Sequence, residues 1–401
     1  MRNEWDSGAA DVVVVGGGVM GLAAARALAR KGSSVVLVER GRVGAEASWA
    51  AAGMLAPQAE ADRRDEFFDL LCAGRDLYPA FADALRAETG IDIELDRTGT
   101  LYLALTESDE HEVLRRYEWQ SRAGLPVERL TAEEARACEP SVAENVRAAL
   151  RFPADWQVEN RRLVAALAAS AASFGVRLLT GVEVTSILVE RGRARGVETS
   201  RGTLAAGAVV VAAGAWSSLI RFERVGRGAQ GEDREDAAAC PRVEPVRGQM
   251  LCFDARPRVV RHVVYSPRGY VVPRRDGRLL AGSTTEHVGY DKAVTGEGLR
   301  AIAAGAQEIA PRVGGLALVD SWSGLRPRAA DDWPVLGASE EVERLYYATG
   351  HYRNGILLAP LTGEVVAGLV TGGEALINGR AREAFAPGRF LRAAVGSRGG
   401  R

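Results

Sequence analysis

A glycine-rich turn between a run of valines and an alanine-rich segment constrains the fold of this chain more than any other feature. The four valines at 12–15 are typical of a strand buried on both faces, and they lead directly into the turn GGGVMG at 16–21. Residues 22–30 are mostly alanine, leucine and arginine, which favour a helix that Gly32 would end. A second valine-rich strand is expected at 34–38. The sequence therefore predicts a βαβ unit with its glycines in the first turn.

The spacing of these glycines is the one that dinucleotide binding requires. Gly16 permits the tight turn, Gly18 lets the backbone approach a pyrophosphate, and Gly21 lets the helix pack closely on the strand. The helix N-terminus then offers unpaired N–H groups and a positive dipole to the phosphates. Glu39, at the end of the second strand, is placed to accept hydrogen bonds from an adenosine ribose, and its charge would repel a 2′-phosphate. These features favour FAD or NAD over NADP.

Charge and cysteine content exclude several classes of protein. The 401 residues include 51 basic and 52 acidic side chains, so no net field exists to attract nucleic acid. The four cysteines form no CxxC pair and no cluster with histidine, which predicts free thiols and no metal site. The apolar run at 12–25 is too short for a membrane span and follows acidic residues, unlike a signal peptide. We expect a cytoplasmic chain without an integral membrane segment.

Three further segments distinguish FAD from NAD. Residues 42–55, RVGAEASWAAAGML, are small enough to lie against a flat ring system, although their composition fits an alanine-rich helix equally well. With the N-terminal fingerprint and the segment GHYRNGILLAP at 350–360, this stretch resembles the FAD-dependent amine and D-amino-acid oxidase superfamily. Within it, the chain most resembles the glycine oxidase group of thiamine biosynthesis. Residues 209–217 and 246–249 also resemble family segments, near the flavin and before the substrate domain respectively.

The resemblance implies an α/β fold of two domains. A discontinuous Rossmann-type FAD-binding domain would comprise 9–60, 151–240 and 323–372, and a substrate domain with a mixed, largely antiparallel β-sheet and helices would comprise 61–150 and 241–322. Alternating apolar residues at 270–273 and 279–281 agree with strands in that sheet. Residues 373–401 would form a C-terminal helix and tail, and 226–239 a mobile loop.

The resemblance also assigns substrate-binding and catalytic residues. Arg326, in GLRP, matches the arginine that clamps the substrate carboxylate, a task for which a guanidinium is suited; a surface ion pair with Asp331 or Asp332 is the alternative. Tyr270 matches a tyrosine that helps to hold this carboxylate, although a tyrosine on an alternating strand also fits a half-buried core position. Arg353 matches a second residue near substrate and flavin. The pocket wall would include Met54 and Thr285.

Noncovalent FAD is the expected cofactor, because no cysteine lies near the C-terminal flavin segment. The backbone before the apolar helix at 358 onward could stabilise negative charge on the reduced flavin ring. The residues expected to bind FAD are Gly16, Gly18, Val19, Met20, Gly21, Glu39, Arg40, Ala47, Ser48, Ala52, Gly53, Met54, Val184, Gly214, His351, Tyr352, Arg353, Asn354, Gly355, Ile356 and Leu357.

The function implied by the resemblance is oxidation of glycine, sarcosine and D-alanine to the imine and 2-oxo acid, with O2 reduced to H2O2, in the service of thiamine thiazole synthesis. Two alternatives stay open: a D-amino-acid dehydrogenase that passes electrons to a quinone or carrier, and a non-catalytic FAD-binding subunit of a complex. The expected partners are a small amino acid and O2, without nucleic acid. A homo-oligomer is compatible with the sequence, which does not fix the oligomeric state.

Overall fold

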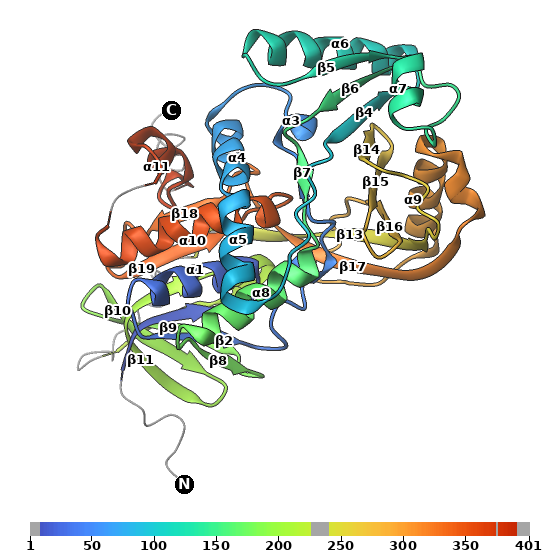
Figure 1. The fold of residues 1–401 in the computed structure, drawn as a ribbon. Coiled ribbons are helices and arrows are strands. Elements are labelled where there is room, and N and C mark those ends of the chain that lie inside the picture. Colours follow the sequence, from blue (N-terminus) through green and yellow to red (C-terminus); the bar gives the residue numbers. More distant parts are fainter. Residues whose placement is uncertain (1–8, 226–239, 374–375, 391–401) are drawn as a thin grey trace, which may run out of the picture.

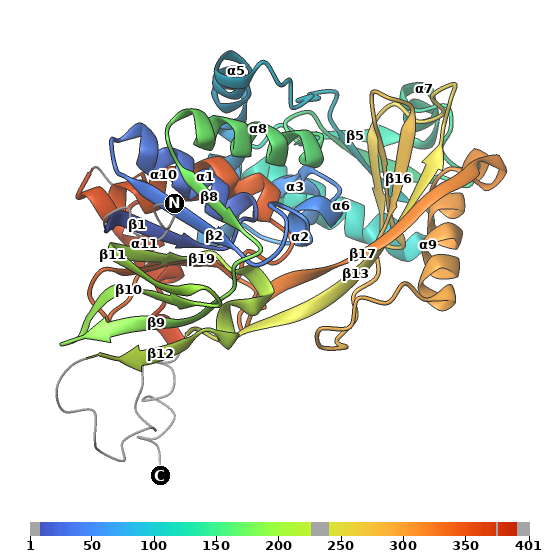
Figure 2. The same cartoon turned by 90° about the horizontal axis from the view of Figure 1, so that it is seen from below.

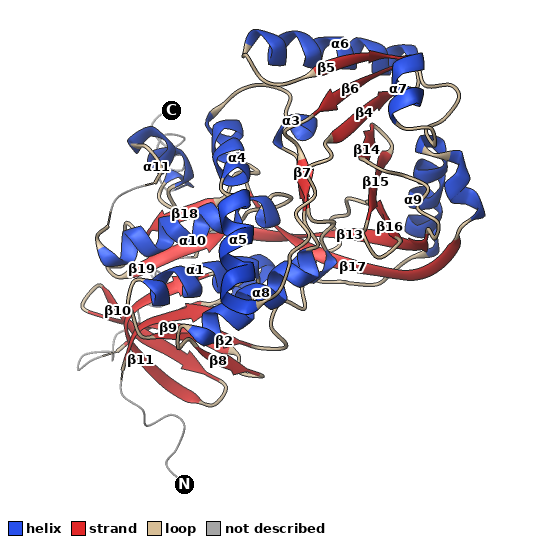
Figure 3. Ribbon diagram, in the orientation of Figure 1, coloured by secondary structure: helices blue, strands red, loops and turns tan. Residues whose placement is uncertain are grey.

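Two sheets, each with its own helices, organise the chain (Figures 1 and 3). The computed structural model describes residues 9–225, 240–373 and 376–390. The mixed α/β class, with a Rossmann-type βαβ unit and a second, largely antiparallel sheet, confirms the predicted fold class. The loop predicted at 226–239 lies outside the described residues, as do residues 391–401 of the predicted C-terminal helix and tail.

The first sheet has nine strands around a parallel centre in which β8, β2, β1, β11 and β19 lie side by side. The β9 and β10 strands extend it in antiparallel fashion next to β11, and β12 and β18 form its margins. The strands are β1 (Ala10–Val15), β2 (Val35–Glu39), β8 (Arg177–Thr180), β9 (Val184–Glu190), β10 (Arg193–Thr199), β11 (Gly202–Val211), β12 (Arg221–Arg224), β18 (Val335–Ala338) and β19 (Leu345–Thr349).

The valine run lies at the centre of this sheet and is buried on both faces, as the sequence predicts. Val12 and Val14 pack with the helical layer, while Val13 and Val15 pack with the core formed on the opposite face by strands β9–β11. The helical layer consists of α1 (Val19–Arg30), α8 (Asn160–Ser173) and α10 (Gly355–Thr371). Because side chains alternate along a strand, this one strand contributes valines to the hydrophobic cores on both faces of the sheet.

The α1 and α10 helices pack closely against each other, and a glycine makes this approach possible. A Cβ added at Gly363 in α10 would lie 2.7 Å from the carbonyl oxygen of Ala23 in α1. Two further helices cover the layer: α4 (Glu66–Asp76) packs on α10 and α5 (Tyr78–Thr89) packs on α8. The sequence predicts residues 61–150 to lie in the substrate domain, and α4 and α5 differ from that expectation. Their amphipathic pattern specified a buried face without specifying which sheet would bury it.

The second sheet has eight strands in the order β17-β13-β16-β15-β14-β4-β6-β5. All of its pairs are antiparallel except β14 with β4. Its strands are β4 (Thr100–Ala104), β5 (Glu128–Thr131), β6 (Ala148–Phe152), β13 (Val243–Asp254), β14 (Val263–Ser266), β15 (Gly269–Pro273), β16 (Arg278–Gly282) and β17 (Ala317–Ala329). The helices α6 (Glu107–Arg122), α7 (Ala132–Cys138) and α9 (Gly296–Ile309) accompany it.

The long antiparallel pair β13 and β17 runs from the first part of the molecule into the second (Figure 2). Between the two parts lie the short elements α2 (Ala47–Ala50), α3 (Pro57–Glu60) and the two-stranded pair of β3 (Met54–Leu55) with β7 (Trp156–Gln157). The remaining elements are two 3-10 turns, η1 (Gly214–Leu219) and η2 (Pro311–Gly315), and α11 (Gly379–Phe385). None of the helices in the described residues has the length and apolar character needed to cross a bilayer.

We predict that Gly363→Ala destabilises the fold, although alanine is the better helix former by about 1 kcal/mol. The new methyl group meets backbone atoms of α1, so the two helices must move apart at a cost of about 1–3 kcal/mol. The control is Gly379→Ala in α11, where no atom lies within 4 Å of the added Cβ. Calorimetry should show a lower Tm for Gly363→Ala than for the control; equal values would contradict the close-approach argument.

Candidate active site

A cavity of about 360 Å³ lies between the two sheets, and segments far apart in the sequence line it. One end is formed by the first turn and by β2, with residues 182–185 opposite. The other end is formed by residues 46–56, by 324–327 of β17 and by 351–356, which lead into α10. One cavity therefore joins the segments along which the sequence predicts a dinucleotide.

The turn end of the cavity has the features that bind a pyrophosphate and a ribose. The α1 helix begins there without a side-chain cap and without an acidic residue in its first turn. The carboxylate of Glu39 accepts hydrogen bonds from the backbone N–H groups of Gly17 (2.7 Å) and Gly41 (2.8 Å), which fix its position. Gly16 has φ +104°, a conformation that favours glycine, and a Cβ at Gly21 would lie 1.9 Å from the oxygen of Gly16. Only glycine permits this approach of helix to turn.

The alanine-rich stretch forms one wall of the cavity. It makes a single helical turn, α2, and then continues in extended form into β3. The helix that its alanine content favours is thus limited to one turn. Asn160, at the start of α8, donates from Nδ2 to the carbonyl oxygens of Ser48 (2.8 Å) and Trp49 (3.0 Å) and so anchors the turn.

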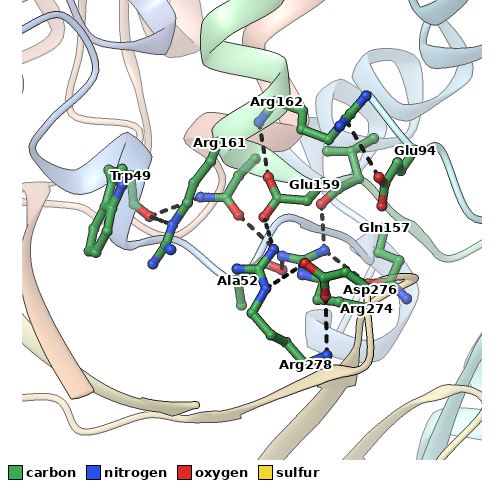
Figure 4. Close-up of polar contacts among 12 residues, drawn as sticks. Trp49, Ala52, Glu94, Gln157, Glu159, Arg161, Arg162, Arg274, Asp276 and Arg278 are labelled. Carbon is green, nitrogen blue, oxygen red and sulfur yellow. Dashed lines mark hydrogen bonds and ion pairs between the residues drawn. The ribbon is translucent and has the colours of Figure 1, made fainter. Parts of the chain in front are cut away.

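A buried guanidinium holds the same wall from the side of the second sheet (Figure 4). Arg274, at the end of β15, donates to the carbonyl oxygens of Ala52 (2.7 Å) and Val158 (2.7 Å) and to the side-chain oxygens of Gln157 and Asn160 (each 3.1 Å). Burial lowers the pKa of Arg274 to about 10, so the group keeps its charge at neutral pH. One side chain therefore fixes the wall, β7 and the start of α8 relative to one another.

Acidic side chains surround this guanidinium at a greater distance. Glu159 and Asp276 both pair with Arg278, at 3.3 and 2.7 Å, and Glu159 also accepts from the backbone N–H of Arg162 at 2.9 Å (Figure 4). Arg274 itself is bonded by neutral oxygens, and the nearby negative charges of Glu159 and Asp276 favour its charged form.

The C-terminal wall is the start of α10. Its N-cap, Asn354, makes no side-chain capping bond, so the first N–H groups of this helix face the cavity without a side-chain acceptor. His351 is buried, and its Nε2 lies 3.0 Å from the hydroxyl of Thr362. Burial lowers the pKa of His351 to about 3. The imidazole is therefore neutral at pH 7 and too weakly basic to serve well as a general base.

Arg326 and Tyr270 lie at the second-sheet wall of the cavity. The guanidinium of Arg326 donates to the carbonyl oxygen of Thr284 (3.0 Å) and the hydroxyl of Ser283 (2.7 Å), and it pairs with no carboxylate in the described residues. The alternative ion pair is absent, because Asp331 pairs with Arg389 and Asp332 pairs with Arg328.

The position of the Arg326 guanidinium depends on a glycine in the neighbouring strand. A Cβ at Gly248 of β13 would lie 2.2–2.3 Å from the guanidinium atoms of Arg326. Tyr270 is half-buried, and its hydroxyl lies 3.4 Å from the sulfur of Met250 on the same strand as Gly248. Both side chains thus share one wall, and the charge of Arg326 is available to an anion.

Arg353 is exposed and lines the cavity, whereas Arg326, Tyr270 and Met54 are half-buried. Arg353 donates from Nη2 to the hydroxyl of Thr285 at 3.1 Å. Thr285 is exposed and does not line the cavity, in contrast to the expectation that it forms the pocket wall. Ser283, the first residue after β16, lines the cavity instead, and the sequence pattern did not distinguish this position from its neighbours.

The lining includes most of the residues expected to bind FAD. It contains Gly16, Gly18, Val19, Met20, Glu39, Arg40, Ala47, Ser48, Ala52, Gly53, Met54, Val184, Gly214, His351, Tyr352, Arg353, Asn354, Gly355 and Ile356. Gly21 and Leu357 lie behind the surface: Gly21 supports the turn, and Leu357 is buried in the helical core. Their individual roles in binding stay predictions.

Two carboxylates near the cavity escaped the sequence analysis. Glu60, the last residue of α3, lines the cavity and accepts a hydrogen bond from the hydroxyl of Tyr265 at 2.7 Å. Asp155 is fully buried and accepts from the backbone N–H groups of Gln58 (3.2 Å) and Ala59 (2.8 Å), which holds α3 in place. No local pattern marks either residue, because their partners lie far away in the sequence.

The residues present fit FAD. The starts of α1 and α10, whose N-cap residues make no side-chain capping bond, line one cavity together with the fixed carboxylate of Glu39 and a wall of small residues. The described residues contain no group of three or more histidine, cysteine or acidic side chains that could hold a metal ion.

Comparisons with known proteins agree with this fit. Residues 11–369 match the family described as DAO, FAD dependent oxidoreductase. The chain is 36% identical over 368 residues to a glycine oxidase from Pseudomonas putida, covering 92% of this chain and 96% of that protein.

Solved structures resemble the chain throughout its length. The crystal structure of glycine oxidase from Geobacillus kaustophilus superposes with a TM-score of 0.86 at 38% identity, covering 95% of this chain and 98% of that one. An L-proline dehydrogenase from P. horikoshii has a TM-score of 0.82 at 26% identity, covering 96% and 98% of the two chains.

We predict that Asp155 makes the fold less stable as pH rises. Burial raises the pKa of Asp155 to about 7, so between about pH 4 and 7 the folded chain keeps a proton that the unfolded chain has lost. Stability from this group therefore falls from pH 5 to pH 8, by about 2 kcal/mol. In Asp155→Asn the free energy of unfolding should not show this fall between pH 5 and pH 8, whereas the control Asp83→Asn, at an exposed position, should show it as the wild type does. Urea unfolding at both pH values tests this, and parallel pH responses of Asp155→Asn and wild type would contradict it.

Proposed function

The chain belongs to the DAO family of FAD-dependent oxidoreductases, and on this premise we propose that it oxidises glycine and other small amino acids, such as sarcosine and D-alanine. The family and its glycine oxidase relatives make the chain an FAD-dependent amino acid oxidase. The products would be an imine, which water converts to a 2-oxo acid and ammonium, and H2O2 formed from O2. For glycine, the imine would also supply thiamine thiazole synthesis.

One observation carries the substrate class. The guanidinium of Arg326 lies in the cavity wall without a carboxylate partner in the described part of the chain. A planar guanidinium binds a carboxylate through two parallel N–H groups, so it would fix the substrate in one orientation. The hydroxyl of Tyr270 would add a donor to the same carboxylate. An amino acid satisfies both groups.

The other charged groups of this end suit the amino side of the substrate. Glu60 is held by Tyr265, whose ring lies 5.3 Å from the ring of Tyr270, so its negative charge is close to the proposed carboxylate site. That charge would favour a cationic ammonium and disfavour a second carboxylate on the substrate. The amine must lose a proton before oxidation. His351 is a poor base, so we assign this proton to water rather than to the imidazole.

Bound FAD supplies the redox chemistry, by accepting a hydride equivalent from the substrate α-carbon. Arg326 and Tyr270 would hold the substrate so that this carbon is correctly positioned, and the chain would also contribute an electrostatic field. The unpaired N–H groups at the start of α10 would stabilise negative charge that develops at the cavity wall. In this proposal the protein orients the substrate and does not act as an acid or a base.

The likeness to an L-proline dehydrogenase favours one alternative, in which electrons pass to a carrier instead of O2. The two functions share the reductive step and differ in the electron acceptor. Anaerobic reduction of bound FAD by glycine, followed by mixing with air, distinguishes them. Reoxidation within the turnover time with H2O2 release supports the oxidase, and slow reoxidation supports the dehydrogenase.

We predict that kcat/KM is higher for glycine, sarcosine and D-alanine than for D-phenylalanine, by roughly a hundredfold. Met54 limits the room beside the wall, and a bulky side chain would displace the α-carbon from its reactive position. L-amino acids should be inert, because the clamp fixes which face of the substrate loses hydride. A peroxide-coupled assay at one oxygen concentration measures the series. Preference for D-phenylalanine would refute the small-substrate proposal, and the absence of turnover would favour a non-catalytic role.

We also predict that Gly248→Ala weakens substrate binding without loss of FAD. The added methyl group would displace the mobile end of Arg326, and KM for glycine should rise at least tenfold. Arg326→Ala should cost more, about 2–5 kcal/mol of substrate binding if the charge pair is buried. The control Gly315→Ala adds a methyl group in open space. Unchanged KM in both Gly248→Ala and Arg326→Ala would show that the carboxylate binds elsewhere.

A further inference from the structure

A cysteine, a histidine and a glutamate form a chain of contacts away from the cavity. Cys138 ends α7, and its sulfur lies 3.8 Å from Nε2 of His262, the residue before β14. The other ring nitrogen of His262, Nδ1, lies 3.1 Å from a carboxylate oxygen of Glu139. None of the three lines the cavity described above. The α7 helix, which Cys138 ends, packs on β5 and β6 of the second sheet (Figure 1), and Cys138 contacts the core that this sheet shares with α7 and α9.

The environment of Glu139 fixes the direction of these contacts. The same carboxylate oxygen accepts the backbone N–H groups of Arg261 (2.7 Å) and His262 (3.0 Å). Burial opposes the charged form of Glu139, but its hydrogen bonds with His262 and Arg261 outweigh this effect and lower its pKa. A carboxylate only accepts, so Nδ1 of the neutral imidazole must donate to it. The lone pair on Nε2 then faces the thiol of Cys138.

This arrangement is the one by which proteins activate a nucleophile: a thiol next to a base, with the base oriented by a third group. The other three cysteines, Cys72, Cys240 and Cys252, have no histidine partner in the described residues. Burial raises the pKa of Cys72 and Cys240 to about 12. Cys138 is partly buried, as Cys72 and Cys240 are, and burial raises its pKa as well, so what distinguishes it is the neighbouring His262, to which its proton can move.

Charged groups around Cys138 act in both directions. Arg151 of β6 and Arg261 favour the thiolate, while Glu139 and Glu128 of β5 oppose it. Arg151 is itself paired with Glu128 at 3.0 Å, which reduces the effect of both. The histidine is therefore the group whose removal should most change the reactivity of the thiol.

We propose that Cys138 is a site of oxidation by hydrogen peroxide, with His262 as its proton acceptor. The thiol proton moves to Nε2 of His262, and the sulfur attacks one peroxide oxygen. An S–O bond forms and the O–O bond breaks, the sulfur loses two electrons and the peroxide gains them. The departing hydroxide takes the proton from His262 and leaves as water, so the products are a sulfenic acid and water. Peroxide is also the co-product of the proposed oxidase, although the step needs only peroxide from any source.

The test is the rate of sulfenic acid formation at each cysteine of the full-length FAD-bound enzyme. Peroxide is added without amino acid, so the result does not depend on the proposed substrate. A dimedone probe with mass spectrometry measures labelling at each site. Cys138 should be labelled at least tenfold faster than Cys72, and Cys138→Ser should abolish the fast labelling while Cys72→Ser leaves it intact.

The role of His262 is tested separately. In His262→Gln, whose fold is checked by calorimetry, labelling of Cys138 should slow at least tenfold, because an amide cannot take up the thiol proton. Equal labelling of Cys138 and Cys72 in the wild-type enzyme would overturn the proposal. An unchanged rate in folded His262→Gln would overturn it too. Should that variant fail to fold, the ranking of the cysteines in the wild-type enzyme decides.

Discussion

Two helices that begin at one cavity without side-chain caps impose the constraint on which the rest of the structure depends. The N-cap residues of α1 and α10 provide no side-chain acceptor, and in α1 the first N–H group, that of Val19, donates instead to the hydroxyl of Ser48 at 3.0 Å. Further N–H groups of both first turns need a ligand or water as acceptor, and both helix starts line the same cavity. Their mutual packing through Gly363 and Ala23 keeps the two ends in a fixed relation. The parallel strands beneath them set the direction of both. The packing of α1 on α10 therefore also sets the geometry of the cofactor cavity.

Buried polar contacts connect the second sheet to the wall of the cavity. Arg274 reaches across to the backbone of Ala52, and Asp155 receives the first N–H groups of α3, whose last residue is Glu60. Each contact joins a segment of the cavity wall to a distant part of the chain. Both groups are charged or chargeable in a low-dielectric interior, so their cost is offset only while all their partners stay in place.

The sequence could predict the parts of this structure that are local. The βαβ unit follows from the valine run, the glycine spacing and the position of Glu39, because each of these acts within a few residues. Arg326 could be selected from the many arginines only through resemblance to a family. Glu60, Asp155 and Ser283 carry no local signal, since their partners come from other elements. For the same reason the sequence did not indicate that Thr285 would be exposed, or that α4 and α5, within the segment assigned to the substrate domain, would pack on α10 and α8.

The strands β13 and β17 have a mechanical consequence. They form an unbroken ladder between the two parts of the molecule, with a single irregularity near Cys252. Rotation of one part relative to the other would have to bend this ladder or break its hydrogen bonds, and no flexible linker interrupts it. Arg326, the proposed carboxylate clamp, lies within this ladder, opposite Val246. We therefore expect the two parts of the molecule to move as one rigid body. Substrate would then enter and leave through rotation of side chains at the edge of the cavity, where Arg353 is exposed.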